Sequence, residues 1–111
     1  MKLVSGLTIS QIKEYLEDKE ENMEWLLNLA YTCYESDDYV TAFSLYNILA
    51  EHGNCTAQCN LAWMYAHALG TERNDIFAAS WFVRAIEQGY DTAVNMAKRC
   101  DANVHFNLGF I

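Results

Sequence analysis

The chain has 111 residues, of which 52% are hydrophobic and 14% aromatic, and its formal net charge is −8. This length suits one small domain, and the apolar content excludes a chain that is disordered throughout. The sequence contains no proline, which favours a nearly all-helical chain with tight turns.

The negative charge is concentrated in the first half of the chain. Residues 1–52 hold ten acidic side chains against three lysines, whereas residues 53–111 hold five against four basic ones. An acidic half repels nucleic acid and anionic lipid at long range and attracts a basic protein surface. A solvated helix face is the simpler interpretation. We expect a cytoplasmic protein, because no apolar run reaches the ~18 residues of a membrane span and none suits a signal peptide.

The predicted elements are about six or seven helices in chain order. Thr8 and Gln11 have the spacing of a capping box and open a helix over residues 8–19, with a break at 18–22. Apolar residues at helical spacing then predict helices over 23–35, 39–52, 55–68, 75–88 and, more weakly, 91–100. The tail, residues 102–111, is apolar and ambiguous.

The middle of the chain repeats itself. Ala42, Gly53 and Ala57 recur 36 residues later as alanine, glycine and alanine. A fixed period of this length with small residues at fixed offsets indicates a helical solenoid. Such stacks of helix pairs form curved binding surfaces and seldom carry chemistry.

A family resemblance follows from residues 57–65, which read Ala-Gln-Cys-Asn-Leu-Ala-Trp-Met-Tyr and resemble the first helix of a Sel-one-like repeat. Gly70, Ala78, Trp81, Phe82, Ala85, Glu87, Gln88 and Gly89 continue that pattern. The match departs at Ala62, at Ile86 and over residues 93–97, and Phe106–Ile111 looks like a further first helix cut short.

The resemblance implies one domain, residues 1–111, that folds as an all-α, right-handed α-α superhelix of antiparallel helix pairs. In this interpretation residues 1–22 form an N-terminal capping helix and residues 23–53 a tetratricopeptide-like pair. Residues 54–89 form a Sel-one-like repeat, and residues 90–111 form a partial repeat or C-terminal cap.

The resemblance also implies a partner-binding surface, because the first helix of each pair lines the concave face of such arrays. The expected partner-binding residues are Glu24, Leu27, Tyr31, Tyr34, Glu35, Cys59, Trp63, His67, Asn95 and Arg99. Exposed aromatic groups beside polar ones are typical of interaction hot spots. The alternative is that the chain's own apolar ends fill this groove.

The cysteines and histidines give little support to a metal site or to catalysis. Cys55 and Cys59 lie one helical turn apart near His52, but this is not a strong zinc-binding spacing and no second pair follows. Small buried hydrophobes are the favoured role of the cysteines, and a disulfide is the remaining alternative. No nucleophile set or phosphate-binding loop is recognisable, so we expect no enzyme, no metal and no cofactor.

The sequence therefore predicts a non-enzymatic protein-binding module. The narrower hypothesis is an acidic immunity or antitoxin-type protein that neutralises a basic partner protein, with its acidic half steering the encounter. The alternative is a self-associating scaffold or adaptor, a homodimer through residues 90–111. A metal-binding or enzymatic protein is the third hypothesis, and no nucleic-acid or membrane partner is expected.

Overall fold

The structure, a computed structural model, describes residues 2–4, 7–8, 10–11 and 20–109. Six α-helices and one pair of short antiparallel β-strands lie within these residues. The helices are α2 (Glu20–Glu35), α3 (Tyr39–Glu51), α4 (Cys55–His67), α5 (Asp75–Glu87), α6 (Asp91–Lys98) and α7 (Ala102–Leu108), and the strands are β1 (Lys2–Val4) and β2 (Leu7–Thr8). The predicted helical class is confirmed for the described part from residue 20 onward.

The N-terminal end differs in part from the prediction of a helix over residues 1–22. β1 and β2 pair antiparallel, with Lys2 opposite Thr8. Two short aliphatic runs close together in the sequence favour such a local pairing of strands. The capping box is present, because Thr8 N–H donates to Gln11 Oε1 (2.9 Å) and Gln11 N–H donates to Thr8 Oγ1 (3.2 Å). Most of the predicted helix, residues 12–19, lies outside the described residues.

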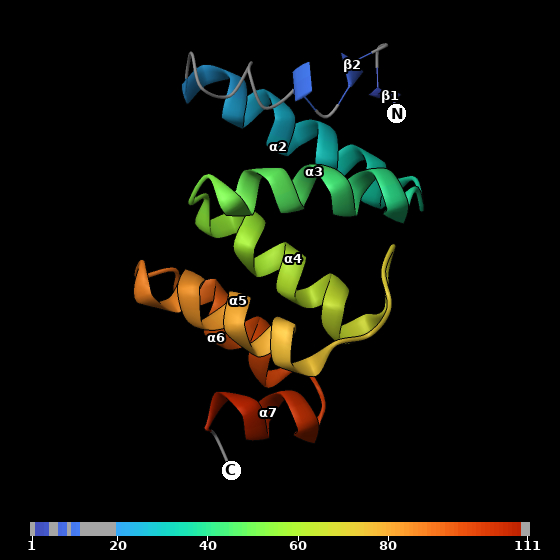
Figure 1. The fold of residues 1–111 in the computed structure, drawn as a ribbon. Helices are drawn as coiled ribbons and strands as arrows, with labels where there is room; N and C mark the ends of the chain where they lie inside the picture. The colour runs from blue at the N-terminus through green and yellow to red at the C-terminus, as the bar shows by residue number, and fades with distance from the viewer. Residues whose placement is uncertain (1, 5–6, 9, 12–19, 110–111) are drawn as a thin grey trace.

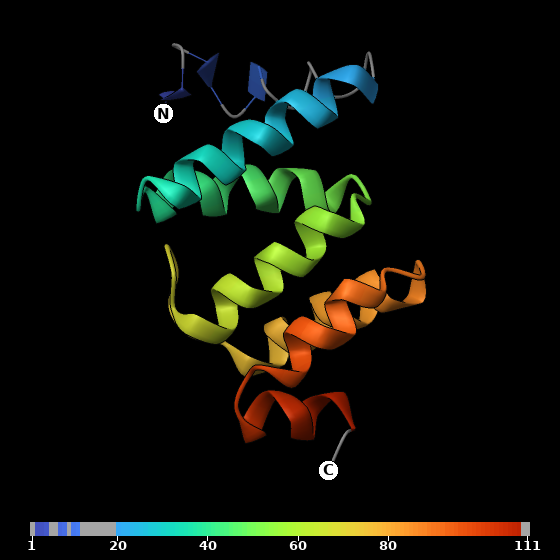
Figure 2. The same ribbon diagram turned by 180° about the vertical axis from the view of Figure 1, so that it is seen from behind.

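Consecutive helices pack against each other along an elongated molecule of 44 × 26 × 20 Å. The two strands and α2 lie at one end and α7 at the other (Figure 1). Helices α3 and α5 lie on the near side in Figure 1, whereas α2 and α6 lie on the near side in Figure 2. The alternate helices thus form two layers, and α4 crosses the middle of the stack.

The 36-residue period of the sequence recurs in the helix ends. The side chains of Asp38 and Asn74 cap α3 and α5 by accepting from the backbone N–H three residues later, at 3.3 and 2.9 Å. Gly53 and Gly89 follow those helices with φ of 92° and 85°. The next N–H, of residue 54 or 90, donates to the carbonyl five residues earlier at 3.2 Å in both copies. The two helix ends are therefore built alike.

Two groups of buried residues lie on either side of α4. The first core joins α2, α3 and one side of α4, with Leu45, Tyr46 and Leu61 among its members. The second core joins the other side of α4 to α5, α6 and α7, around Phe82 and several alanines. Helix α4 therefore contributes buried apolar residues to both cores. None of the described helices is both long and apolar enough to cross a membrane.

Two helices begin at residues other than those predicted. Helix α2 begins at Glu20, inside the predicted break, where its first acidic residues suit the positive end of a helix. Helix α7 begins at Ala102 rather than at Phe106, because the Asp101 carboxylate accepts from the backbone N–H of Asn103 at 3.1 Å and caps it. Since α7 packs on α5, it covers the end of the second core.

Candidate functional site

An aromatic groove is lined by residues of α2, α3 and α4 and by Met96 and Arg99 at the end of α6. Its volume is about 250 Å³. The residues that line it are Tyr31, Tyr34, Tyr46, Asn60, Trp63, Met96 and Arg99. Because these residues come from four helices, the groove exists only when both cores are formed. Rigid aromatic groups beside a few polar ones are suited to binding another molecule through stacking and hydrogen bonds.

The floor of the groove is held by a buried polar contact. Tyr46 is 1% exposed, and its hydroxyl is hydrogen-bonded to the side chain of Asn60. Burial raises the pKa of Tyr46 far above its ordinary value, with the Asn60 hydrogen bond opposing the rise. The phenol therefore stays neutral, and the bond fixes Asn60 at the bottom of the groove.

Trp63 forms the wall of the groove toward α6. Its ring is stacked on His67, with ring centroids 3.9 Å apart and an interplanar angle of 28°. The guanidinium carbon of Arg99 lies 5.8 Å from the centroid of the Trp63 ring. His67 Nδ1 lies 2.9 Å from the Trp63 carbonyl oxygen, which can only accept, so Nδ1 is the nitrogen that donates. These contacts hold the indole in one orientation.

The opposite edge of the groove is acidic. Tyr31 is 57% exposed, and its hydroxyl donates to Glu35, an interaction that raises the pKa of Tyr31. Tyr34 packs edge to face on Tyr39 with centroids 5.3 Å apart, and the Tyr39 hydroxyl donates to Asp37 at 2.9 Å. Glu35, at the end of α2, thus borders the groove through Tyr31, and Arg99 also lines the groove.

Four of the ten residues expected to bind a partner line the groove, namely Tyr31, Tyr34, Trp63 and Arg99. Four of the others lie beside it or elsewhere on the surface. Glu35 bonds to Tyr31, and His67 stacks on Trp63. Glu24 and Asn95 are exposed but do not line the groove.

The remaining two expected residues face inward. Leu27 is half-buried against the first core. Cys59 is 1% exposed and its thiol donates to Met96 Sδ at 3.1 Å, so it is a core residue and not a surface contact. Asn60, the next residue, takes the place in the groove that was expected for Cys59. The recurrence of asparagine at 28 and 60 was the available sequence signal for it.

The cysteines are free thiols. Cys33, Cys59 and Cys100 are buried, and Cys55 is half-buried. Burial is the main cause that raises the pKa of Cys59 to about 12 and that of Cys100 to about 11. These two thiols are therefore protonated and weakly nucleophilic at neutral pH. No three His, Cys, Asp or Glu side chains gather into a metal-binding group in the described part of the chain.

Comparisons of this chain with protein-family models, with curated proteins and with solved structures found no match. The groove must therefore be interpreted from its own geometry and chemistry.

Proposed function

We propose that this protein is a non-enzymatic, helical-repeat binding module of the Sel-one-like type, with the right-handed superhelical stacking typical of that family. The 36-residue period in sequence and in helix ends supports this proposal. The neutralisation of one basic partner, as by an immunity or antitoxin-type protein, is the narrower form of the proposal.

The observation that carries the proposal is the pairing of an aromatic groove with an acidic border. Tyr31 and Trp63 supply large, rigid contact surfaces at low entropic cost. Glu35 is hydrogen-bonded to Tyr31, and Asp37 is bonded to Tyr39, whose ring packs on Tyr34. These carboxylates favour a basic partner. The occupant that fits is a segment of a basic protein, with an apolar or aromatic side chain in the groove and a Lys or Arg near Glu35.

Affinity capture with groove variants tests this function. The tagged chain, Tyr31→Ala and Trp63→Leu are used as baits, and Trp25→Ala is the matched control because Trp25 is 47% exposed and outside the groove. We expect basic proteins to be retained by the wild type and by Trp25→Ala, and to be lost at least tenfold from the groove variants. Purified partner should then bind less tightly as salt increases. Equal capture by all four baits, or salt-independent binding, contradicts the proposal.

Self-association is the second candidate function, favoured by an exposed apolar strip beside α7. Ile76 and Val83 on α5 are 64% and 37% exposed and line a hollow that also includes Asn107. A dimer through residues 90–111 and this strip would cover it. Light scattering over a hundredfold concentration range decides this candidate, because a constant monomer mass excludes it.

A further inference from the structure

Three tyrosines gather on the side of the aromatic groove that belongs to the first core. Tyr31 and Tyr34 come from α2 and Tyr46 from α3, and all three line the groove. The hydroxyls of Tyr31 and Tyr46 are already hydrogen-bonded, to Glu35 and Asn60 respectively. Aromatic rings attract a cation, but this surface replaces few of the hydrogen bonds that a primary ammonium loses on leaving water. A quaternary ammonium has no N–H donors, so the surface suits it.

One negative side chain borders the groove and one positive side chain lines it. Glu35 lies at the end of α2, and its partner is the neutral hydroxyl of Tyr31. Arg99 follows α6 and lines the groove, and within the described residues it forms no ion pair. Helix α4 lies between α2 and α6 in both ribbon views (Figure 1 and Figure 2), so the two charges come from different sides of α4. A ligand that carries both charges is complementary to this arrangement.

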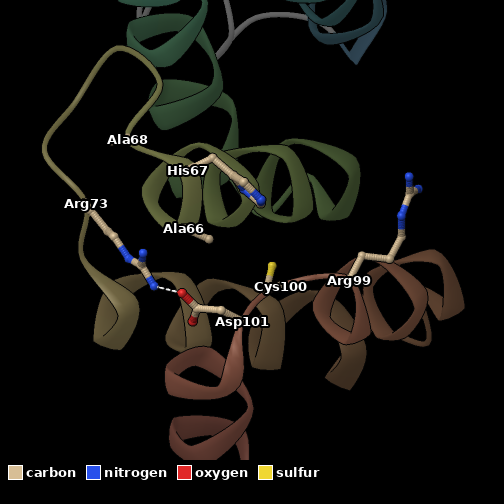
Figure 3. A pocket seen from close by; sticks show the side chains of 7 residues that line it. All are labelled: Ala66, His67, Ala68, Arg73, Arg99, Cys100 and Asp101. Atoms are coloured by element: carbon tan, nitrogen blue, oxygen red, sulfur yellow. Dashed lines mark hydrogen bonds and ion pairs between the residues drawn. The ribbon is translucent and has the colours of Figure 1, made fainter.

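The Arg99 side chain serves the groove rather than the neighbouring hollow. That hollow, of about 500 Å³, lies at the junction of α6 and α7 and includes Arg73, Cys100 and Asp101 in its lining. Arg99 belongs to the same lining, but Figure 3 shows its guanidinium extending away from the hollow. The guanidinium carbon lies 5.8 Å from the centroid of the Trp63 ring, a wall of the groove. Its forked N–H donors match the oxygens of a carboxylate or phosphate group.

We propose that the aromatic groove binds a small zwitterion that carries a quaternary ammonium and a carboxylate or phosphate group, the chemistry of the betaines. The ammonium lies against Tyr31, Tyr34 and Tyr46, and the anionic group pairs with Arg99. The groove volume of about 250 Å³ is below that of pockets for drug-sized ligands and suits such a small molecule. The inference concerns the groove of the proposed function but requires no protein partner, so either can fail without the other.

The test is an NMR titration of the intact protein at constant ionic strength, followed at the Trp63 indole N–H and the Asn60 side-chain amide. Glycine betaine and phosphocholine are the two zwitterions. Choline lacks the anionic group, 3,3-dimethylbutanoate has carbon in place of the charged nitrogen, and glycine lacks the methyl groups. We expect saturable shifts, with the better zwitterion at least about fivefold tighter than each of these three ligands.

The two zwitterions distinguish the anionic group of the ligand. Tighter binding of phosphocholine indicates a phosphate, and equal or tighter binding of glycine betaine indicates a carboxylate. Shifts that do not saturate with either zwitterion overturn the proposal. The same holds if choline, 3,3-dimethylbutanoate or glycine binds as tightly as the better zwitterion.

Arg99→Gln and Arg84→Gln form a matched pair of variants for the anionic group. Both arginines are exposed and lie over a tryptophan, Arg84 at 4.6 Å from the Trp81 ring, but Arg84 is outside the groove. We expect Arg99→Gln to bind the zwitterion and choline equally, because the anionic group has lost its partner, and Arg84→Gln to keep the preference for the zwitterion. An unchanged preference in Arg99→Gln overturns the proposal.

Tyr31→Leu and Trp25→Leu form the matched pair for the ammonium. Both aromatic residues lie exposed on α2, and only Tyr31 lines the groove. We expect Tyr31→Leu to weaken choline binding about fivefold and Trp25→Leu to leave it unchanged; equal effects overturn the proposal. Zwitterion binding by a chain that captures no basic protein supports this inference alone. Capture of a basic protein without zwitterion binding overturns it and leaves the proposed function intact.

Discussion

The two cores on either side of α4 are filled in different ways. The first core is dominated by large side chains that are almost fully buried, namely Leu26, Leu45, Tyr46, Leu49, Leu61 and Met64. The second core is dominated by alanines at 0–7% exposure, namely Ala62, Ala66, Ala78, Ala85, Ala93 and Ala97, around Phe82 and Val104. Large side chains fill the space between helices, whereas small ones allow the backbones to approach closely.

This difference predicts which kind of substitution destabilises each core. Removal of atoms from the first core leaves a cavity, and addition of atoms to the second core forces helices apart. The aromatic groove lies over the first core, since Tyr46 belongs to both. The hollow lined by Arg73, Cys100 and Asp101 borders the second core through Cys100. Stability variants therefore distinguish the two cores.

The largest expected effect is the loss of a large residue from the first core. Leu45 is 0% exposed, so Leu45→Ala should lower the free energy of unfolding by about 3 kcal/mol, within the range for buried leucines. Urea denaturation measures this change. Val40→Ala on the same helix is the control, because Val40 is 60% exposed and its truncation should change stability by less than about 0.5 kcal/mol. Similar losses in both variants would contradict the assignment of the first core.

The next largest effect is expected at the loop that joins α4 to α5. Gly70 has φ of 72°, and an added Cβ would overlap the backbone carbonyl of Tyr39 at the start of α3. Gly70→Ala should therefore lower the free energy of unfolding by about 2–3 kcal/mol. Gly53→Ala is the matched control: φ is 92°, but nothing lies within 4 Å of the added Cβ, so about 1 kcal/mol is expected. Thermal or urea denaturation measures both variants. A larger loss of unfolding free energy in Gly53→Ala than in Gly70→Ala would contradict the close contact of Gly70 with Tyr39.

Overpacking of the second core should have an intermediate effect. Ala78 is 0% exposed, and Ala78→Leu should lower the free energy of unfolding by about 1–3 kcal/mol while Ser80→Leu, at an exposed position, changes it little. The same denaturation experiment measures both. A second core that accepts leucine at position 78 without loss would show that its helices are not closely packed.

The smallest expected effect is a loss of stability at alkaline pH, caused by two buried cysteines of the second core. The pKa of Cys59 is raised from 9.0 to about 12 and that of Cys100 from 9.0 to about 11, mainly by burial. Because these folded-state values exceed the unfolded value, their stabilisation is complete below pH 9 and declines as pH rises toward 11–12. The urea midpoint should fall between pH 9 and 11, and less steeply in Cys59→Ala/Cys100→Ala. Parallel pH profiles for the two proteins would exclude this cause.

The sequence predicted the central helices well because their ends carry local signals. Asp38, Asn54 and Asn74 each cap a helix, and Gly53 and Gly89 each follow one, so α3, α4 and α5 begin where predicted and end within a residue of the prediction. The β1–β2 pair and the start of α7 were missed. Their segments are too short for periodicity to distinguish strand, helix and loop.

The site was predictable only in part, because helical spacing does not decide between neighbouring residues. Cys59 and Asn60 are both one turn from Trp63, and either could face a groove on α4. The packing of α6 determines which of the two residues faces the groove, because Met96 covers the thiol of Cys59 and leaves Asn60 open to the groove. Such a contact joins residues 37 apart in sequence and has no local signal.

Helix α4 is shared by the two cores, and this has a consequence for motion. Leu61 and Met64 point to one core and Ala62 and Ala66 to the other, so neither half retains its wall if α4 detaches. We therefore expect that opening of one half also loosens the other, so that the two halves unfold as one cooperative unit. The amides of α4 should consequently exchange their hydrogens only through global unfolding, and a ligand that clamps α4 protects the whole stack from proteases.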